Sequence, residues 1–411
     1  MAETDGGESG SPPGGVRPET PWRGVTAVSV ALTVVCTLPV MLAGALAVQM
    51  REELQFSVAA LGAVIALYRG AGAVVSAPVG RFADRVGPVG SMRIAAGIAA
   101  AVGFGVAAFA RNWLSFALLL MSGSVAYTLG QTGANLLISR AVPARRQGTA
   151  FGLKQAALPL GSMLAGIAVP LVALTIGWRW AWVVAALSAL LVALLVPSSR
   201  DQRTRANPSA ENRTQRTASL LLLGIALFFA VSAATTLTAF TVDAAVSAGI
   251  SPAVGGLLLA LGSATSITVR LVAGWIADRR DGGHLAVVAR MVLVGAVGYA
   301  LLAVPNLVGM TLGTLLAFGL GWGFNGLFWF AIVRLNERTP GRAVGVVNIG
   351  GLLGGLAGPL TFGWVVGTWG YSVAWGFAAA WALVGGVVML VARRLDARAA
   401  LGSSTRRPRA R

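Results

Sequence analysis

Apolar and polar positions alternate along this chain in long blocks. From Val25 onward, apolar runs of about 20 residues, the helical length that crosses ~30 Å of hydrocarbon, are separated by short polar breaks. Strands are excluded because open sheet edges do not occur in lipid, and the runs lack the short alternation of a barrel. The pattern predicts an all-α polytopic membrane protein with twelve transmembrane helices, at residues 25–48, 57–79, 91–110, 114–139, 149–174, 179–196, 218–243, 252–273, 285–304, 307–333, 343–367 and 371–392.

Composition supports a membrane protein and excludes several other classes. Hydrophobic residues make up 56% of the 411 residues and charged residues only 11%, whereas about a quarter of a soluble domain is charged. A single cysteine, Cys36, and a single histidine, His284, exclude a disulfide framework and the usual metal clusters. We expect no metal and no cofactor. The spans contain no clustered acids and no nucleophile with a base, so an enzyme is not expected.

The distribution of basic residues predicts the topology. Only Arg51, Arg111 and Arg179 fall in the breaks that follow odd-numbered spans, and the other breaks carry many arginines. Loops rich in Lys and Arg stay in the cytoplasm, so both termini are expected there, in a multi-pass protein of the cell (cytoplasmic) membrane. The net charge of +18 then faces anionic headgroups, and no nucleic-acid partner is expected.

The same pattern divides the chain into five segments. The first 22 residues contain Gly, Ser, Pro and four acids with little to bury, and residues 197–217 form a polar, arginine-rich break between the sixth and seventh spans. We expect a disordered cytoplasmic tail at residues 1–22, a six-helix bundle at 23–196, a cytoplasmic linker at 197–217, a second six-helix bundle at 218–392 and a basic cytoplasmic tail at 393–411.

The two bundles carry an internal sequence repeat. Gly80-Arg-Phe-Ala-Asp84-Arg85 follows the second span, and Gly274-Trp-Ile-Ala-Asp278-Arg279 follows the eighth, 194 residues later. Repetition in register across both halves indicates an internal duplication. Parallel six-helix repeats are the architecture in which substrate binds between the halves by alternating access. Further pairs at spacings of 194 or 193 are Asn112 and Asn306, Gln131 and Asn325, Arg140 and Arg334, Gly161 and Gly355, Gly177 and Gly370, Trp182 and Trp375, and Ala185 and Ala378.

These duplicated loops make the chain resemble the major facilitator superfamily (MFS). The resemblance covers Val25 to Arg394 and implies that family's fold and transport activity. The chain departs from the family signature after Gly87, where Pro88 replaces the usual basic residues. The arginine that proton antiporters of the family often carry in the fourth span is also missing here, so the motifs do not predict antiport.

The resemblance implies a gate in the duplicated loops. Asp84 would help to lock the cytoplasmic side in the outward-facing state, with Arg140 or the amino end of the eleventh span as its partner. A glycine at the start of each loop permits a tight helix exit. The alternative is that the loops only cap helices and set topology. The candidate gating residues are Gly80, Asp84, Arg85, Arg140, Gly274, Asp278 and Arg279.

Two basic residues inside the spans are candidate substrate contacts. Arg69 lies 12 residues into the second span, which places it about 18 Å below the outer surface and too deep to reach water easily. Lys154 lies about two turns above the cytoplasmic end of the fifth span, where it either faces the interior or snorkels to the headgroups. Arg270 lies two turns from Asp278 and is expected to anchor at the interface or to pair with the loop. If Arg69 and Lys154 both face the interior, an anionic solute is favoured.

Polar and aromatic residues of two repeat-equivalent spans are further candidates. By the resemblance, the fourth and tenth spans line the central cavity, and their side chains would form a substrate wall of amides and aromatics. The alternative is interhelical hydrogen bonding, worth about 1 kcal/mol per contact. On the fourth span, residues at i, i+4 and i+8 share one helical face, and the tenth span has residues at i, i+3 and i+7: Tyr127, Gln131 and Asn135, and Trp322, Asn325 and Trp329.

The sequence thus predicts a secondary transporter of a small organic solute, an organic anion or polar metabolite. Its expected partners are that solute and the lipid bilayer, and it is expected to be a monomer. Proton coupling needs a titratable carboxylate, for which Asp243 is the candidate; the alternative is that Asp243 lies in ordinary solvent at an outer helix end. A competing function is drug-type efflux of amphipathic compounds, favoured by the aromatic residues Trp322, Phe328 and Trp329.

Overall fold

A computed structural model describes residues 22–196, 217–277, 279, 283–336 and 340–404. Nearly all of the predicted N-terminal tail and linker, at residues 1–21 and 197–216, lies outside this part of the chain. Of the predicted C-terminal tail, residues 393–404 continue the last helix, whereas residues 405–411 also lie outside this part of the chain. The elements within it are all helical: α1 (Trp22–Ala45), α2 (Ala47–Leu54), α3 (Val58–Phe109), α4 (Trp113–Ala141), α5 (Ala144–Ala168), the π-helix η1 (Val169–Ala173), α6 (Trp178–Leu195), α7 (Thr217–Ser247), α8 (Pro252–Ala277), α9 (His284–Leu302), α10 (Leu307–Leu316), the π-helix η2 (Ala317–Trp322), α11 (Asn325–Leu335) and α12 (Pro340–Ser404).

The helices have the length and exposure of membrane spans. Within the described residues, 10 helical segments are long and apolar enough to cross a membrane. Large apolar side chains lie on the outside of the bundle, with Leu194 82% and Val74 80% exposed. Such a surface is stable against lipid and not against water, which confirms an all-helical membrane protein.

Two predicted breaks between spans are kinks within long helical elements. α3 runs for 52 residues and α12 for 65, and each leaves helical geometry at one glycine, Gly87 (φ 81°) and Gly370 (φ 83°). L side chains avoid this left-handed region, so glycine permits these breaks. The predicted breaks at residues 80–90 and 368–370 are therefore present at these two glycines, but they are kinks and not loops, because the residues on either side remain helical. Gly177, which precedes Gly370 by 193 residues, also has a positive φ (102°), so the repeat extends to backbone conformation.

The predicted span at residues 307–333 is divided into α10, η2 and α11. Its middle contains closely spaced glycines that lie against α9: a Cβ added to Gly321 would lie 2.8 Å from Cε2 of Tyr299, and one added to Gly295 would lie 2.5 Å from Cα of Gly321. This close backbone approach accompanies the local π-helical winding. The predicted span is therefore present as one helical segment, Leu307–Leu335, but its winding is π-helical in the middle and not α-helical throughout.

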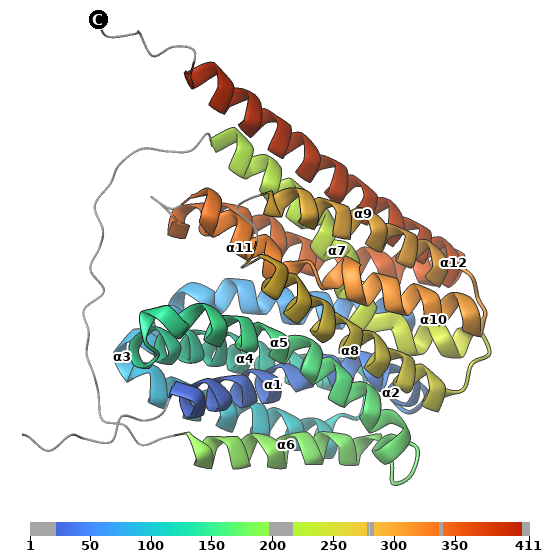
Figure 1. The fold of residues 1–411 in the computed structure, drawn as a ribbon. Coiled ribbons are helices and arrows are strands. Elements are labelled where there is room, and N and C mark those ends of the chain that lie inside the picture. The colour runs from blue at the N-terminus through green and yellow to red at the C-terminus, as the bar shows by residue number, and fades with distance from the viewer. Residues whose placement is uncertain (1–21, 197–216, 278, 280–282, 337–339, 405–411) are drawn as a thin grey trace, which may run out of the picture.

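The two halves of the chain, residues 22–196 and 217–404, pack together at one end. In Figure 1 the helices up to α6 gather in the lower part, and most of the later helices lie above them. We call the end where α1 begins and α6 ends the termini end. At the opposite end, glycines bring the backbones of the halves into contact. This glycine interface consists of Gly44 against Ala239, Gly62 against Gly363, and Gly166 against Gly256.

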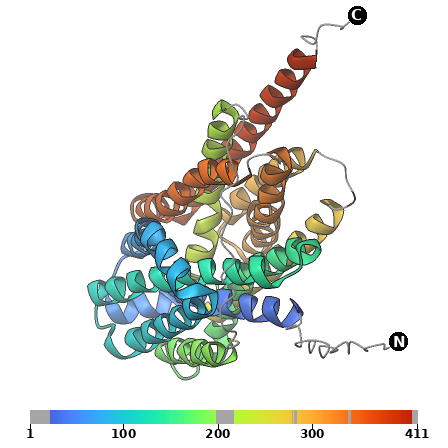
Figure 2. The same cartoon turned by 90° about the vertical axis from the view of Figure 1, so that its left-hand side faces the viewer.

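The same helices are separated at the termini end. A Cβ added to Gly80 of α3, Gly152 of α5, Gly274 of α8 or Gly345 of α12 would meet no atom within 4 Å. Figure 1 shows α7 and the last part of α12 diverging from the first half toward this end, and Figure 2 shows the same helices from that side. The structure is thus closed at the opposite end and open at the termini end.

A polar clamp fixes the opposite end within the first half. Arg179 Nη2 donates to Glu53 Oε1 at 2.7 Å, and Trp178 Nε1 donates to Glu53 Oε2 at 2.6 Å. The hydrogen bond from Arg179 is the main reason that the pKa of Glu53 lies below its usual value. Glu53 therefore stays ionised at neutral pH and holds α2 against the start of α6.

Candidate functional site

Lys154 is buried inside the helix bundle. Its side chain is 3% exposed, and its Nζ donates to Oε1 of Gln131 and, at 2.7 Å, to Oδ1 of Asn135. Gln131 and Asn135 lie one turn apart on α4, on the shared face that the sequence predicts. Lys154 therefore turns inward, and the alternative that it snorkels to the headgroups was wrong.

Two N–H donors of the candidate residues have no acceptor. Nε2 of Gln131 and Nε of Arg69 are buried without a hydrogen-bond partner. The two ion pairs within the described residues join Arg51 to Asp243 and Arg179 to Glu53, so no described carboxylate neutralises Arg69 or Lys154. Buried donors normally find acceptors, so these groups have unused capacity to bind an anion or another acceptor-rich solute.

Arg69 lies between the two halves. A Cβ added to Gly355 of α12 would lie 3.8 Å from Cδ of Arg69, so the arginine stem runs beside the second half. The neighbouring Tyr68 packs with Tyr127 of α4, with ring centroids 6.5 Å apart. Lys154, Gln131 and Asn135 form one hydrogen-bonded cluster of α4 and α5. Tyr127 lies one turn along α4 from this cluster, and Arg69 lies on α3 next to the tyrosine that packs on Tyr127.

Arg270 is a third basic residue of the interior, although its sequence position near Asp278 predicts a location at the interface. Its Nη2 donates to the Trp322 carbonyl at 3.0 Å, its Nη1 donates to the Gln155 carbonyl at 3.4 Å, and its guanidinium lies 5.2 Å from the Trp322 ring centroid. The expectation that Arg270 anchors at the interface was wrong. Arg270 lies two helical turns inward from Asp278, where these carbonyls accept its hydrogen bonds. The sequence feature that indicates this interior location is the position of Arg270 deep in an apolar span.

The three candidates of the tenth span do not form one row. Trp322 ends η2 and is 7% exposed, whereas Asn325 begins α11 and shares a face with Trp329. The predicted i, i+3, i+7 spacing fails at Trp322 because it assumed continuous α-helix. Asn325 and Trp329 are partly exposed, and no hydrogen bond between Asn325 and Gln131 is present in the described structure.

The first gating loop lies at the open termini end. Gly80, Asp84 and Arg85 are on the helical part of α3 that continues past the predicted span, and the side chains of Asp84 and Arg85 are exposed. Among the described residues, no ion pair joins Asp84 to Arg140. Since the helices are separated here, this conformation does not contain the predicted lock.

The second gating loop differs from the first. Gly274 lies near the end of α8, and Asp278 falls outside the described residues. Arg279 stacks on the ring of Trp275, with Cζ 3.7 Å from the ring centroid. Its guanidinium therefore has an aromatic partner.

Asp243 joins the two halves at the opposite end. It is 5% exposed and accepts hydrogen bonds from Arg51 Nη1 at 2.6 Å and from the Tyr371 hydroxyl. Arg51 belongs to the first half and Asp243 and Tyr371 to the second. The alternative that Asp243 lies in ordinary solvent was wrong. Its partners were missed because they lie 192 and 128 residues away along the chain.

A helical membrane protein whose halves meet at one end and separate at the other has the architecture of a secondary transporter. Residues 28–338 match the Major Facilitator Superfamily, which is more than half of the chain, and the chain belongs to this family. The predicted family is confirmed, and the protein is a transporter and not an enzyme.

Solved structures share this fold at low sequence identity. A D-xylose-proton symporter superposes with a TM-score of 0.74 at 15% identity, over 89% of this chain and 97% of that one. A nucleoside transporter gives 0.68 at 16%, over 89% and 99%. A bacterial homolog of the human lysosomal transporter Spinster, inward-facing and occupied, gives 0.67 at 15%, over 91% and 97%. No curated protein matches the sequence.

Proposed function

We propose that this transporter moves a small organic anion, or a polar metabolite that carries an anionic group, across the cell membrane. The observation that carries the proposal is the set of three interior basic residues, Arg69, Lys154 and Arg270, without a described carboxylate in ion-pair contact. An anion would accept hydrogen bonds from Lys154 Nζ and from the unpaired N–H groups of Gln131 and Arg69. Charge-assisted bonds of this kind are the strong ones in proteins.

The proposed topology has twelve membrane crossings. At ~1.5 Å per residue, α3 and α12 are each more than twice as long as one crossing requires, and each breaks once, at Gly87 and Gly370. Arginines such as Arg81 and Arg279 gather at the termini end, which favours a cytoplasmic location for that end and for both termini. The conformation is then inward-facing, in a single chain of two six-helix bundles that acts as a monomer.

Alternating access requires two exchanges of contacts. The glycine interface and the Arg51–Asp243–Tyr371 group separate when the opposite end opens, while the Asp84 loop engages as the termini end closes. Protonation of Asp243 would remove the charge that holds Arg51. Asp243 is therefore our candidate for coupling transport to protons.

Drug-type efflux of amphipathic compounds is the second candidate function, favoured by the aromatic residues of η2 and α11. Phe328 is fully buried and Trp322 is 7% exposed. Of the three aromatic residues in that hypothesis, Trp329 alone offers appreciable surface to a ligand. The small exposed aromatic area therefore favours transport of an anion over transport of an amphipathic compound.

The test compares charge classes of substrate. Proteoliposomes on a solid-supported membrane are challenged with mono- and dicarboxylates and with the amphipathic cation tetraphenylphosphonium. We expect currents with one or more carboxylates, lost in Arg69→Ala and retained in Arg290→Ala, which removes an exposed arginine of α9. Currents for the cation that survive Arg69→Ala would make Arg69 structural and support the efflux function.

The proposed gate gives a second expected result. Asp84→Asn should leave membrane insertion intact and lower the transport rate at least about tenfold, because the neutral amide loses a charged hydrogen bond in the state that closes the termini end. The measurement is initial transport rate per folded transporter, with Glu52→Gln, an exposed acid at the opposite end, as control. A full rate in Asp84→Asn with normal expression would contradict a gating role.

A further inference from the structure

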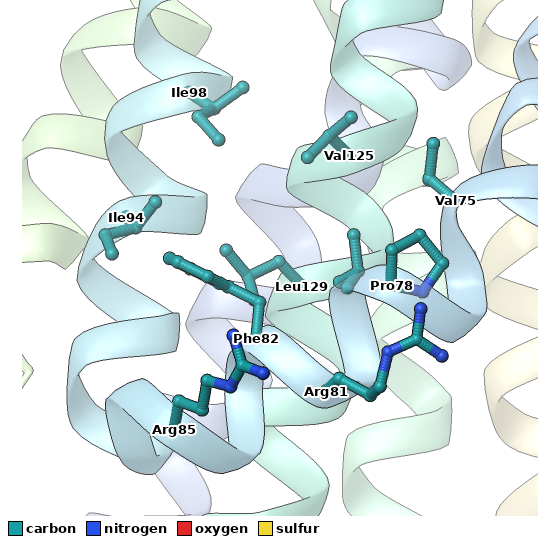
Figure 3. Close-up of a pocket in the computed structure, with 10 residues that line it drawn as sticks. Val75, Pro78, Arg81, Phe82, Arg85, Ile94, Ile98, Val125 and Leu129 are labelled. Carbon is teal, nitrogen blue, oxygen red and sulfur yellow. The ribbon is translucent and has the colours of Figure 1, made fainter.

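A groove outside the proposed transport path lies along the first half near the termini end. It has a volume of about 670 Å³ and runs between the two parts of α3 and α4. Its walls are mainly apolar, including Phe82, Ile94, Ile98 and Leu129, and two arginines, Arg81 and Arg85, complete its lining. Figure 3 shows both arginines at one end of the groove and Ile98 and Val125 at the other.

The groove faces away from the interior group. On α4, Val125 lines the groove two residues before Tyr127, which is a rotation of about 200° around the helix axis. On α3, Pro78 lines it nine residues after Arg69, which corresponds to about 180°. Both helices therefore turn one face to the interior cluster and the opposite face to the groove, so the groove opens toward the bilayer.

The two arginines of the groove are available to a ligand. Both are exposed, and no described carboxylate forms an ion pair with either one. They lie four residues apart on α3 and therefore project from the same side of the helix, one turn apart. Two guanidinium groups at this spacing can bind the oxygens of one phosphate.

The second half contains an equivalent groove that lacks the two arginines. A groove of about 320 Å³ lies at the corresponding place in the second half, between α8, α9, η2 and α11, and no arginine lines it among the described residues. At the spacing of 194 residues, Trp275 takes the place of Arg81, and Arg279, in the place of Arg85, stacks on Trp275. The paired free guanidiniums therefore belong to the first half.

We propose that the groove of the first half binds one anionic phospholipid, with its phosphate between Arg81 and Arg85. An acyl chain lies along Phe82, Ile94 and Ile98 toward the middle of the membrane. Charge complementarity and the direction of the apolar wall both select a lipid, because a free phosphate would leave that wall unoccupied. Basic pockets beside transmembrane helices bind anionic headgroups in this way.

Native mass spectrometry of the full-length protein in detergent tests the proposal. Phosphatidylglycerol and phosphatidylcholine with identical acyl chains are added in equal amounts. We expect the wild type to retain about tenfold more phosphatidylglycerol, because both lipids carry the phosphate but the cationic choline group of phosphatidylcholine is repelled by the two guanidinium groups. Arg81→Ala/Arg85→Ala should bind both lipids equally, and Arg279→Ala, the repeat-matched control, should keep the wild-type preference. Ile94→Trp, which fills the apolar wall, should lower binding of both lipids.

Three results would overturn the proposal: equal binding of the two lipids by the wild type, an unchanged preference in the double variant, or displacement of phosphatidylglycerol by glycerol phosphate, which has no acyl chain. The last would identify a site for free phosphate. If the double variant does not elute as a monodisperse protein, Arg81→Gln alone replaces it, with a reduced preference expected and an unchanged one contradicting the proposal.

Discussion

Replacement of Lys154 by methionine is expected to lower transport of the substrate anion at least about 30-fold. Methionine fills a similar volume, but it removes the buried charge and the hydrogen bonds to Gln131 and Asn135. Loss of one member of a buried charged contact costs about 2–5 kcal/mol, and each 1.4 kcal/mol is about tenfold. The measurement is the concentration dependence of the current carried by the anion that the wild type transports.

The controls separate binding from folding. Arg290→Met removes an exposed positive charge at the same end and should leave transport unchanged. Gln131→Leu removes a hydrogen-bond acceptor of Lys154 but keeps the charge, so it should reduce transport less than Lys154→Met does. Wild-type transport by a folded Lys154→Met protein would show that the amine only connects α5 to α4.

The second large effect is expected from the glycine interface. Gly62→Leu should trap the transporter with its opposite end open, because a Cβ at this position would lie 3.2 Å from Cα of Gly363 and closer still to the Pro359 carbonyl oxygen. Overpacking costs about 1–3 kcal/mol, which at the upper end shifts a two-state equilibrium by about two orders of magnitude. Transport should fall accordingly.

Spin labels can report this change in conformation directly. The only cysteine, Cys36, is fully buried, so background labelling is low. Labels at Gly152→Cys and Gly345→Cys, which face open space at the termini end, should move closer together in Gly62→Leu. Gly376→Leu is the matched control because a Cβ at Gly376 meets no atom within 4 Å. Normal transport with an unchanged label distance in Gly62→Leu would contradict the role of the interface.

The sequence predicted the positions of most membrane spans but not how far each helix extends beyond its span. The span expected at 114–139 is α4 (Trp113–Ala141), because hydropathy reports the thickness of the hydrocarbon. It does not report whether a helix extends into the headgroup region, as α3 does through Arg81 and Arg85 to Gly87. The π-helical winding of η2 occurs where its glycines pack against α9, and this contact between distant segments is not visible in a local pattern.

The sequence predicted which residues belong to the interior group but not which of them form hydrogen bonds with one another. Helical periodicity placed Gln131 and Asn135 on one face. The free-energy cost of burying a charge in the membrane marked Arg69 and Lys154 as candidate substrate contacts. Whether Lys154 turns inward or snorkels depends on acceptors supplied by another helix, and periodicity within one helix does not identify them. The partners of Asp243, Arg51 and Tyr371, lie on separate helices, so only the assembled fold brings them together.

The glycine interface also bears on how the transporter responds to temperature. A long side chain that becomes immobilised in a contact loses up to about 2 kcal/mol of rotamer entropy, whereas glycine loses none. Closing the opposite end through Gly44, Gly62 and Gly166 therefore orders few rotamers, and opening it releases few. Side-chain entropy then contributes little to the balance between the two conformations at this interface, so that contribution keeps nearly the same value as the cell warms or cools.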